Sequence, residues 1–112
     1  MLIQNNMFES ISNMLGISPK VDLGEVIKEG ATILDVRTKG EFTEGHIRGS
    51  VNISVDKLAG NINKLKTKDN PIITCCASGA RSAAAKQILN ANGFTNVHNG
   101  GSWISLKQKY SL

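Results

Sequence analysis

Cysteine, aromatic residues and long apolar runs are all scarce in this chain of 112 residues, and each scarcity excludes a class of protein. The only two cysteines, Cys75 and Cys76, are neighbours, so a disulfide between them would close almost no loop and stabilise little. Two cysteines are too few for a tetrahedral zinc site, and no residue pattern calls for another metal or an organic cofactor. No stretch approaches the roughly 20 apolar residues of a membrane helix, so we expect no membrane association. The cysteine pair is therefore either buried or reactive.

The charge balance is weakly basic, with a formal net charge of +4 and an aromatic content of 4%. A nucleic-acid partner is not expected, because no basic stripe is interleaved with aromatic residues. The one dense lysine cluster predicts a solvated helix face and loop with a general attraction for small anions. This cluster comprises Lys57, Lys64, Lys66 and Lys68, with Asp56 and Asp69 close to it.

The first residues lack the features of a secretory signal, because the first basic residue is Lys20 and polar residues interrupt the apolar ones. We therefore predict a cytoplasmic protein. Apolar residues recur at helical spacing over residues 1–17, and Gly16 is a natural stop. This pattern predicts an appended N-terminal helix that packs on the domain or, as the second choice, forms a dimer contact. The pattern does not fix the oligomeric state.

Residues 18–112 alternate between strand and helix patterns and predict one domain. Alternation of this kind indicates an α/β fold, with a mostly parallel central sheet of about five strands and helices on both faces. Ligands of such sheets bind beyond the carboxyl ends of the strands. Apolar runs predict strands over 31–36, 50–53, 71–74 and 95–98, and helices are expected from a capping box at Asp22 and Glu25 to Gly30, over 58–65, over 82–92, and after Gly100 and Gly101.

The junction between the third strand and the following helix carries the chemistry. Cys75 is placed as the last buried residue of the strand, whereas Cys76 begins a turn of small residues. A tight turn there directs backbone N–H groups inward, beside a helix N-terminus, and such a nest attracts anions. A thiolate is an anion, so the pKa of Cys76 should be lowered and its sulfur nucleophilic. Arg81 opposes the helix dipole at that position, and binding an anion would explain its presence.

The turn resembles the active-site loop of rhodanese-like sulfurtransferases, whose pattern is Cys-x-Ser-Gly-x-Arg-Ser. The matching residues are Cys76, Ala77, Ser78, Gly79, Ala80, Arg81 and Ser82. Upstream, the Leu34–Arg37 segment, Glu41-Phe42 and Gly45-His46-Ile47 are similar to the family's first signature, and downstream Gly100-Gly101 with Trp103 is similar to its closing motif. The resemblance extends from about Val21 to Leu106 and implies a small rhodanese-like fold over residues 18–112.

The resemblance also implies a reaction. Cys76 would attack a small anionic sulfur donor such as thiosulfate, carry the sulfur as a persulfide, and pass it to a thiol, to cyanide or to an acceptor protein. The loop residues 77–82 would bind the substrate, with Arg81 holding the anionic end of the donor and Ser78 adding a hydroxyl hydrogen bond. We expect His46, Asp35 and Arg37 to be structural, and Trp103 to lie in the core or in a pocket wall.

Three alternatives remain open. Counted from Cys75, the spacing to Arg81 is the Cys-x5-Arg of phosphatases and arsenate reductases with this fold, although Thr74 stands where that pattern has His. A second alternative is a sulfur-relay module that works with a partner protein and has little turnover of its own. In a third, Cys75 resolves an oxidised Cys76, which requires a strained disulfide between neighbours.

Overall fold

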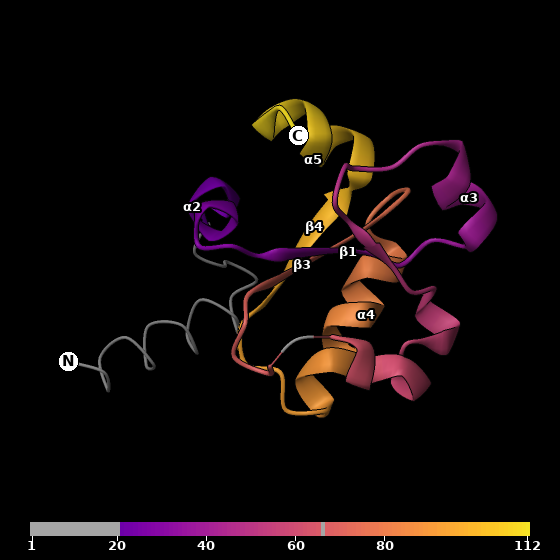
Figure 1. Ribbon diagram of the computed structural model, residues 1–112, viewed down its shortest axis with the longest axis vertical. Helices are drawn as coiled ribbons and strands as arrows, with labels where there is room; N and C mark the ends of the chain where they lie inside the picture. The colour runs from indigo at the N-terminus through magenta and orange to yellow at the C-terminus, as the bar shows by residue number, and fades with distance from the viewer. Residues whose placement is uncertain (1–20, 66) are drawn as a thin grey trace, which may run out of the picture.

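The computed structural model describes residues 21–65 and 67–112, so the helix expected over residues 1–17 lies outside the described residues. A parallel sheet forms the centre, with strand order β2-β1-β3-β4 (Figure 1). The strands are β1 (Thr32–Asp35), β2 (Val51–Asn52), β3 (Ile72–Cys76) and β4 (Val97–Ser102). The parallel α/β architecture is as predicted. The described part of the chain has four strands rather than about five, because it contains only four apolar strand runs.

Helices cover both faces of the sheet. In Figure 1, α2 and α5 lie above the sheet, and α4, η1 and η2 lie below it. The short helix α3 lies beyond the carboxyl end of β1. The α-helices are α2 (Leu23–Lys28), α3 (Lys39–Glu44), α4 (Ala80–Ala91) and α5 (Trp103–Tyr110), and the 3₁₀ helices are η1 (Val55–Lys57) and η2 (Ala59–Lys64).

Two apolar cores fill the spaces between the sheet and its helices. Successive side chains of a strand point to opposite faces. Strand β3 therefore contributes Ile72 and Cys76 to the core between the sheet and α4, and Ile73 and Cys75 to the core between the sheet and helices α2 and α5. All five residues of β3 are buried, which is typical of a strand covered on both faces. The two adjacent cysteines therefore lie on opposite sides of the sheet.

Three local predictions require correction. Asp22 caps α2 by accepting from the Gly24 amide at 2.9 Å, but Glu25 pairs with Lys28 rather than completing a capping box. The segment predicted as a helix over 58–65 is 3₁₀ and kinks at Asn61, whose φ of −128° is not helical. Gly60 precedes this kink and weakens any α-helix there.

The closing glycines also differ from the expected turn. Gly100 and Gly101 belong to β4, where the register against β3 shifts between Thr74 and Cys76. A Cβ atom on Gly100 would lie 2.8 Å from the Thr74 carbonyl oxygen, and the φ of Gly101 is +76°. Glycine is therefore required where β4 bulges between its pairings with Thr74 and Cys76.

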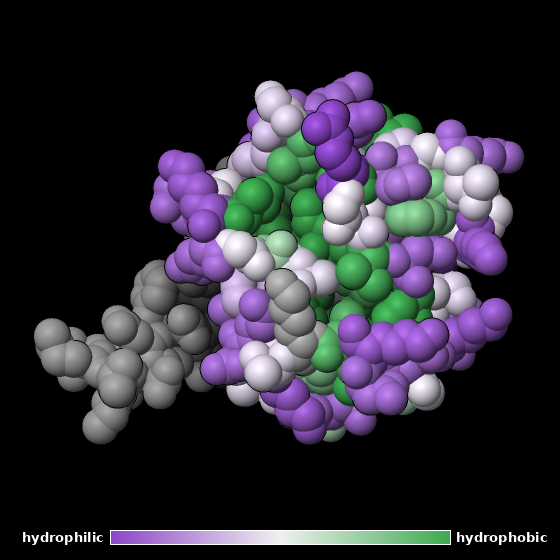
Figure 2. All heavy atoms as spheres, viewed as in Figure 1, coloured by the Kyte–Doolittle hydropathy of each residue, from purple (hydrophilic) through white to green (hydrophobic). Residues whose placement is uncertain are grey.

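Polar and apolar side chains are unevenly distributed over the surface. Figure 2 shows hydrophilic side chains around the rim of the molecule and apolar ones gathered between the elements in the middle of this face. Among the described residues, no helix is both long and apolar enough to cross a bilayer.

Candidate active site

Cys76 ends β3 and lies at the base of the loop that leads into α4. Its Sγ atom is 3.0 Å from the Gly79 amide nitrogen, 3.4 Å from the Ser82 amide nitrogen and 3.5 Å from the Ser82 hydroxyl oxygen. Gly79 makes this turn with a φ of +108°, in the left-handed region that favours glycine. The Thr74 hydroxyl donates to the Ser82 carbonyl at 2.9 Å, which fixes the first turn of α4 against β3. The predicted amide nest is thus formed around one sulfur atom.

The surroundings of the two cysteines drive their pKa values in opposite directions. Burial alone raises the pKa of Cys76, but hydrogen bonds from the Ser82 hydroxyl and from the amides of Ser82, Gly79 and Ser78 outweigh burial and lower it. Burial, followed by the charge of Asp35, raises the pKa of Cys75 to about 12. The sulfur of Cys76 is therefore much easier to ionise than that of its neighbour.

The remaining loop residues are arranged as a lid over that sulfur. Cys76 and Ser82 are fully buried, whereas Ala77, Ser78 and Ala80 are exposed. Among the described residues, the Ser78 hydroxyl has no hydrogen-bond partner. Ser78 contributes through its backbone amide instead. Most of the hydrogen bonds that stabilise a negative charge on the Cys76 sulfur therefore come from main-chain amides. Small side chains at the loop positions leave these amides free to turn toward the sulfur.

Arg81 lies at the rim, where it pairs with a carboxylate of the same chain. Its Nη1 and Nη2 atoms are 2.7 Å and 3.0 Å from the two Glu41 carboxylate oxygens. The hydrogen bond from Arg81, followed by that from the Thr38 backbone, lowers the pKa of Glu41 to about 2. Glu41 supplies an anion for Arg81 that our sequence analysis did not identify. The missed signal was Thr38-x-x-Glu41, whose side chains form a capping box at the start of α3.

The upstream motif contains a buried ion pair between Asp35 and Arg37, and such a pairing was expected for these two residues. Arg37 is buried against Asp35, with an Nη2–Oδ2 distance of 2.7 Å, and donates to the carbonyl oxygen of Gly45 at 2.7 Å. Its guanidinium carbon lies 4.4 Å from the centre of the Trp103 ring, which places Trp103 in the packing around this ion pair. His46 is exposed, and its Nδ1 atom lies 2.8 Å from a backbone carbonyl of α3.

Asn99 is a further residue of the site that the sequence did not single out. Its Oδ1 atom lies 2.6 Å from the Ser82 hydroxyl oxygen. The residue faces Thr74 across the β3–β4 pairing, and only that register brings it to the loop. Without the strand register, nothing in the sequence distinguishes Asn99 from the other asparagines.

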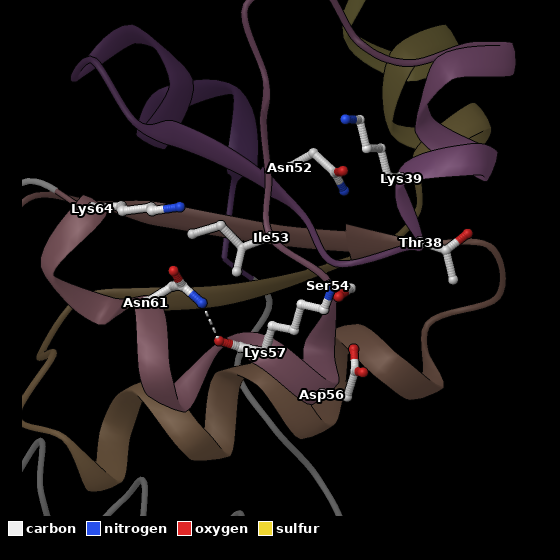
Figure 3. Close-up of a pocket in the computed structure, with 9 residues that line it drawn as sticks. All are labelled: Thr38, Lys39, Asn52, Ile53, Ser54, Asp56, Lys57, Asn61 and Lys64. Atoms are coloured by element: carbon white, nitrogen blue, oxygen red, sulfur yellow. Dashed lines mark hydrogen bonds between the residues drawn. The ribbon is translucent and has the colours of Figure 1, made fainter.

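A basic hollow of about 440 Å³ lies at the ends of β1 and β2, beside the starts of α3 and η1 (Figure 3). It is lined by Thr38, Lys39, Asn52, Ile53, Ser54, Asp56, Lys57, Asn61 and Lys64. None of these residues belongs to the 76–82 loop. Lys57 and Lys64 come from the predicted lysine cluster and, with Lys39, give this end of the sheet a positive charge that attracts anions.

Comparison with known proteins agrees with the geometry. The Rhodanese-like domain family matches residues 20–102. The thiosulfate sulfurtransferase GlpE of Shewanella oneidensis is 31% identical over 85 residues, covering 76% of this chain and 81% of that protein. A rhodanese-related protein of Thermoplasma volcanium, whose crystal structure is known, is 36% identical with a TM-score of 0.67, covering 79% of this chain and 86% of that one.

Other similar proteins are longer than the matched region. The uncharacterized protein YqhL of Bacillus subtilis is 39% identical over 69 residues, which cover 62% of this chain and 54% of that protein. The uncharacterized protein YibN of Escherichia coli is 31% identical over 93 residues, covering 80% of this chain and 65% of its own length. The chain thus spans about half to two thirds of these two curated relatives.

Proposed function

The chain belongs to the rhodanese-like domain family, and we propose that it is a sulfurtransferase that carries sulfane sulfur as a persulfide on Cys76. The observation that carries this proposal is the convergence of the Gly79 and Ser82 amides on the Cys76 sulfur, at the carboxyl end of a central parallel strand. Amides fixed in this orientation stabilise a negative charge on sulfur without reorganising during the reaction.

The proposed reaction has two steps, and the second returns Cys76 to its thiolate form. In the first, the Cys76 thiolate attacks the outer sulfur of thiosulfate, and a new sulfur–sulfur bond forms on Sγ. The donor's own sulfur–sulfur bond breaks, and its electron pair leaves with sulfite. In the second step, cyanide or a thiolate attacks the outer sulfur of the anionic persulfide, and Cys76 leaves as the thiolate. No external oxidant or reductant is needed.

Thiosulfate is proposed as the donor because GlpE of Shewanella oneidensis is named a thiosulfate sulfurtransferase. Arg81 belongs to the loop motif, its charge interacts with Cys76, and its guanidinium would bind the sulfonate end of this donor. Because its guanidinium already pairs with Glu41, a bound donor must share or displace that carboxylate.

The phosphatase alternative receives no support from the geometry. A nucleophile at position 75 would have to ionise against a pKa of about 12, on the face of the sheet away from the loop amides. The resolving role of Cys75 is unsupported for the same reason, since the two side chains pack in different cores.

A relay module that receives sulfur from a partner protein is the second candidate, and the Arg81–Glu41 pair favours it. Neutralising the loop's cation weakens the attraction for a dianion such as thiosulfate, but it hardly affects a persulfide delivered by another protein. Both candidates use the same Cys76 persulfide and differ only in the donor.

The test compares the wild type with the matched variants Cys76→Ala and Cys75→Ala. Thiocyanate production from thiosulfate and cyanide, together with a mass gain of one sulfur atom after thiosulfate treatment, should be absent only from Cys76→Ala. Loss in Cys75→Ala alone, with the fold retained, would overturn the assignment. A persulfide that forms without appreciable thiocyanate turnover would favour the relay.

A further inference from the structure

The Ser82 hydroxyl group has three neighbours and only one proton to donate. Its oxygen is 2.6 Å from Asn99 Oδ1, 3.0 Å from the Gly79 carbonyl oxygen and 3.5 Å from the Cys76 sulfur. A hydroxyl donates one hydrogen bond and accepts up to two, so only one of these neighbours receives the proton. Whether the hydroxyl stabilises the thiol or the thiolate of Cys76 depends on which neighbour receives this proton.

The orientation of the Asn99 side-chain amide determines which neighbour receives the proton of the Ser82 hydroxyl. The Gly101 backbone N–H donates to Oδ1 of Asn99 at 3.0 Å, and a backbone N–H cannot accept. The amide oxygen therefore faces Ser82, and the Nδ2 group lies toward the Gly79 carbonyl at 3.5 Å. Since two oxygens 2.6 Å apart need a proton between them, the Ser82 hydroxyl donates to Asn99.

With its proton turned toward Asn99, the Ser82 hydroxyl presents lone pairs to Cys76. It can accept from the S–H of the neutral thiol, which is the direction of the 3.5 Å contact. It stabilises the thiolate only after its proton rotates away from the amide oxygen. In this arrangement the charged sulfur is stabilised by the main-chain amides, and the contribution of the Ser82 hydroxyl to the lowered pKa of Cys76 requires that rotation first.

We infer that Asn99 is a positioning residue that holds the Ser82 hydroxyl in the accepting orientation and thereby restrains ionisation of Cys76. The inference rests on the proposed role of Cys76 and adds a regulator of its reactivity. The same sulfur must attack the donor and later leave from the persulfide. A lower pKa weakens its attack on the donor but speeds its departure. Asn99 thus sets the balance between the two half-reactions.

Other charged groups near the sulfur are left unchanged by substitutions at Asn99. Arg81, on α4, and Cys75, on β3, interact electrostatically with Cys76. Neither has a hydrogen bond to Asn99 among the described residues. Asn99 itself is exposed, so its replacement leaves no core cavity.

The experiment is a carbon-13 NMR titration of cysteine Cβ in a Cys75→Ala background, where Cys76 is the only thiol. Asn99→Ala should lower the pKa of Cys76 by about half to one unit, because the freed proton turns to the thiolate. Asn99→Asp keeps the shape and accepts more strongly, so it should raise that pKa. Asn92→Ala, at the far end of α4, is the control and should leave the pKa unchanged.

Asn99→Asp also adds a negative charge near the sulfur, and repulsion by that charge raises the pKa whatever the hydroxyl does. The Ser82→Ala background therefore separates this mechanism from simple repulsion and from loosening of the loop. Ser82→Ala alone should shift the pKa little, and adding Asn99→Ala to it should shift it no further. An unchanged or raised pKa in Asn99→Ala, or a fall that persists without the Ser82 hydroxyl, would overturn the inference. The titration requires no sulfur transfer, so an inactive protein with the expected coupling would count against the proposed function only.

Discussion

The two adjacent cysteines should differ in reactivity by orders of magnitude. A pKa of about 12 leaves roughly one Cys75 thiol in 10⁵ ionised near pH 7. An ordinary cysteine is ionised to a few per cent there, and the lowered pKa of Cys76 takes it above that fraction. The thiolate populations therefore differ by a factor on the order of 10³ or more, although the residues are neighbours in the chain.

Alkylation of the native protein with iodoacetamide, followed by intact mass and peptide mapping, measures this difference. We expect one adduct, on Cys76, in the wild type and in Cys75→Ala, and none over the same period in Cys76→Ala. The denatured protein is the control, since there both cysteines should react at similar rates. Because Cys76 is 0% exposed, the reagent reaches it only when the 77–80 lid shifts. Modification of Cys75 within tenfold of the rate at Cys76, or native resistance at both, would refute the reasoning.

Three further substitutions test other parts of the structure. Asp35→Asn removes the counter-charge of a buried guanidinium and should lower the free energy of unfolding in urea by about 3–5 kcal/mol, whereas Glu25→Gln, in an exposed pair, should cost at most about 0.5 kcal/mol. Glu41→Gln should release Arg81 and lower the KM for thiosulfate about two- to fivefold; an unchanged or higher KM would contradict this. It should also remove the stability that the wild type loses as the pH falls from the ordinary carboxyl pKa toward about 2, because the pKa of Glu41 is lowered in the folded state. Gly100→Ala places a Cβ 2.7 Å from a β3 side chain and should cost about 1–3 kcal/mol in the same urea assay.

The centre of the sheet could be predicted from the sequence because β1 and β3 are buried on both faces. Residues 31–36 and 71–74 are mostly apolar, and in the structure β1 lies within the first segment and β3 begins inside the second. Helix α3 was missed because it has six residues, none of them buried, so no apolar periodicity marks it. Its only signal is the capping box at Thr38 and Glu41. The sequence pattern also predicts a capping box at Asp22 and Glu25, but there Glu25 forms an ion pair with Lys28.

The preference for Cys76 over Cys75 came from the sequence and stays a prediction, but the expected strand end was wrong, because β3 continues through Cys76 and both cysteines are buried. The motif and the polar turn after β3 both favoured Cys76, and strand alternation then places Cys75 on the opposite face. The partner of Ser82 was not accessible. Asn99 reaches it only because β4 pairs with β3 in one register and then bulges at Gly100 and Gly101.

Arg81 shows how a correct motif can leave the electrostatics of a site undetermined. A cation at a helix N-terminus requires an anion, and the resemblance assigned that anion to the substrate. In the structure, Glu41 provides it from forty positions upstream, held in place by its own capping box. A thiosulfate dianion must therefore compete with a carboxylate whose pKa of about 2 keeps it charged at any physiological pH. The motif predicts sulfur chemistry at Cys76, whereas the Arg81–Glu41 pair predicts which donor charge the loop favours.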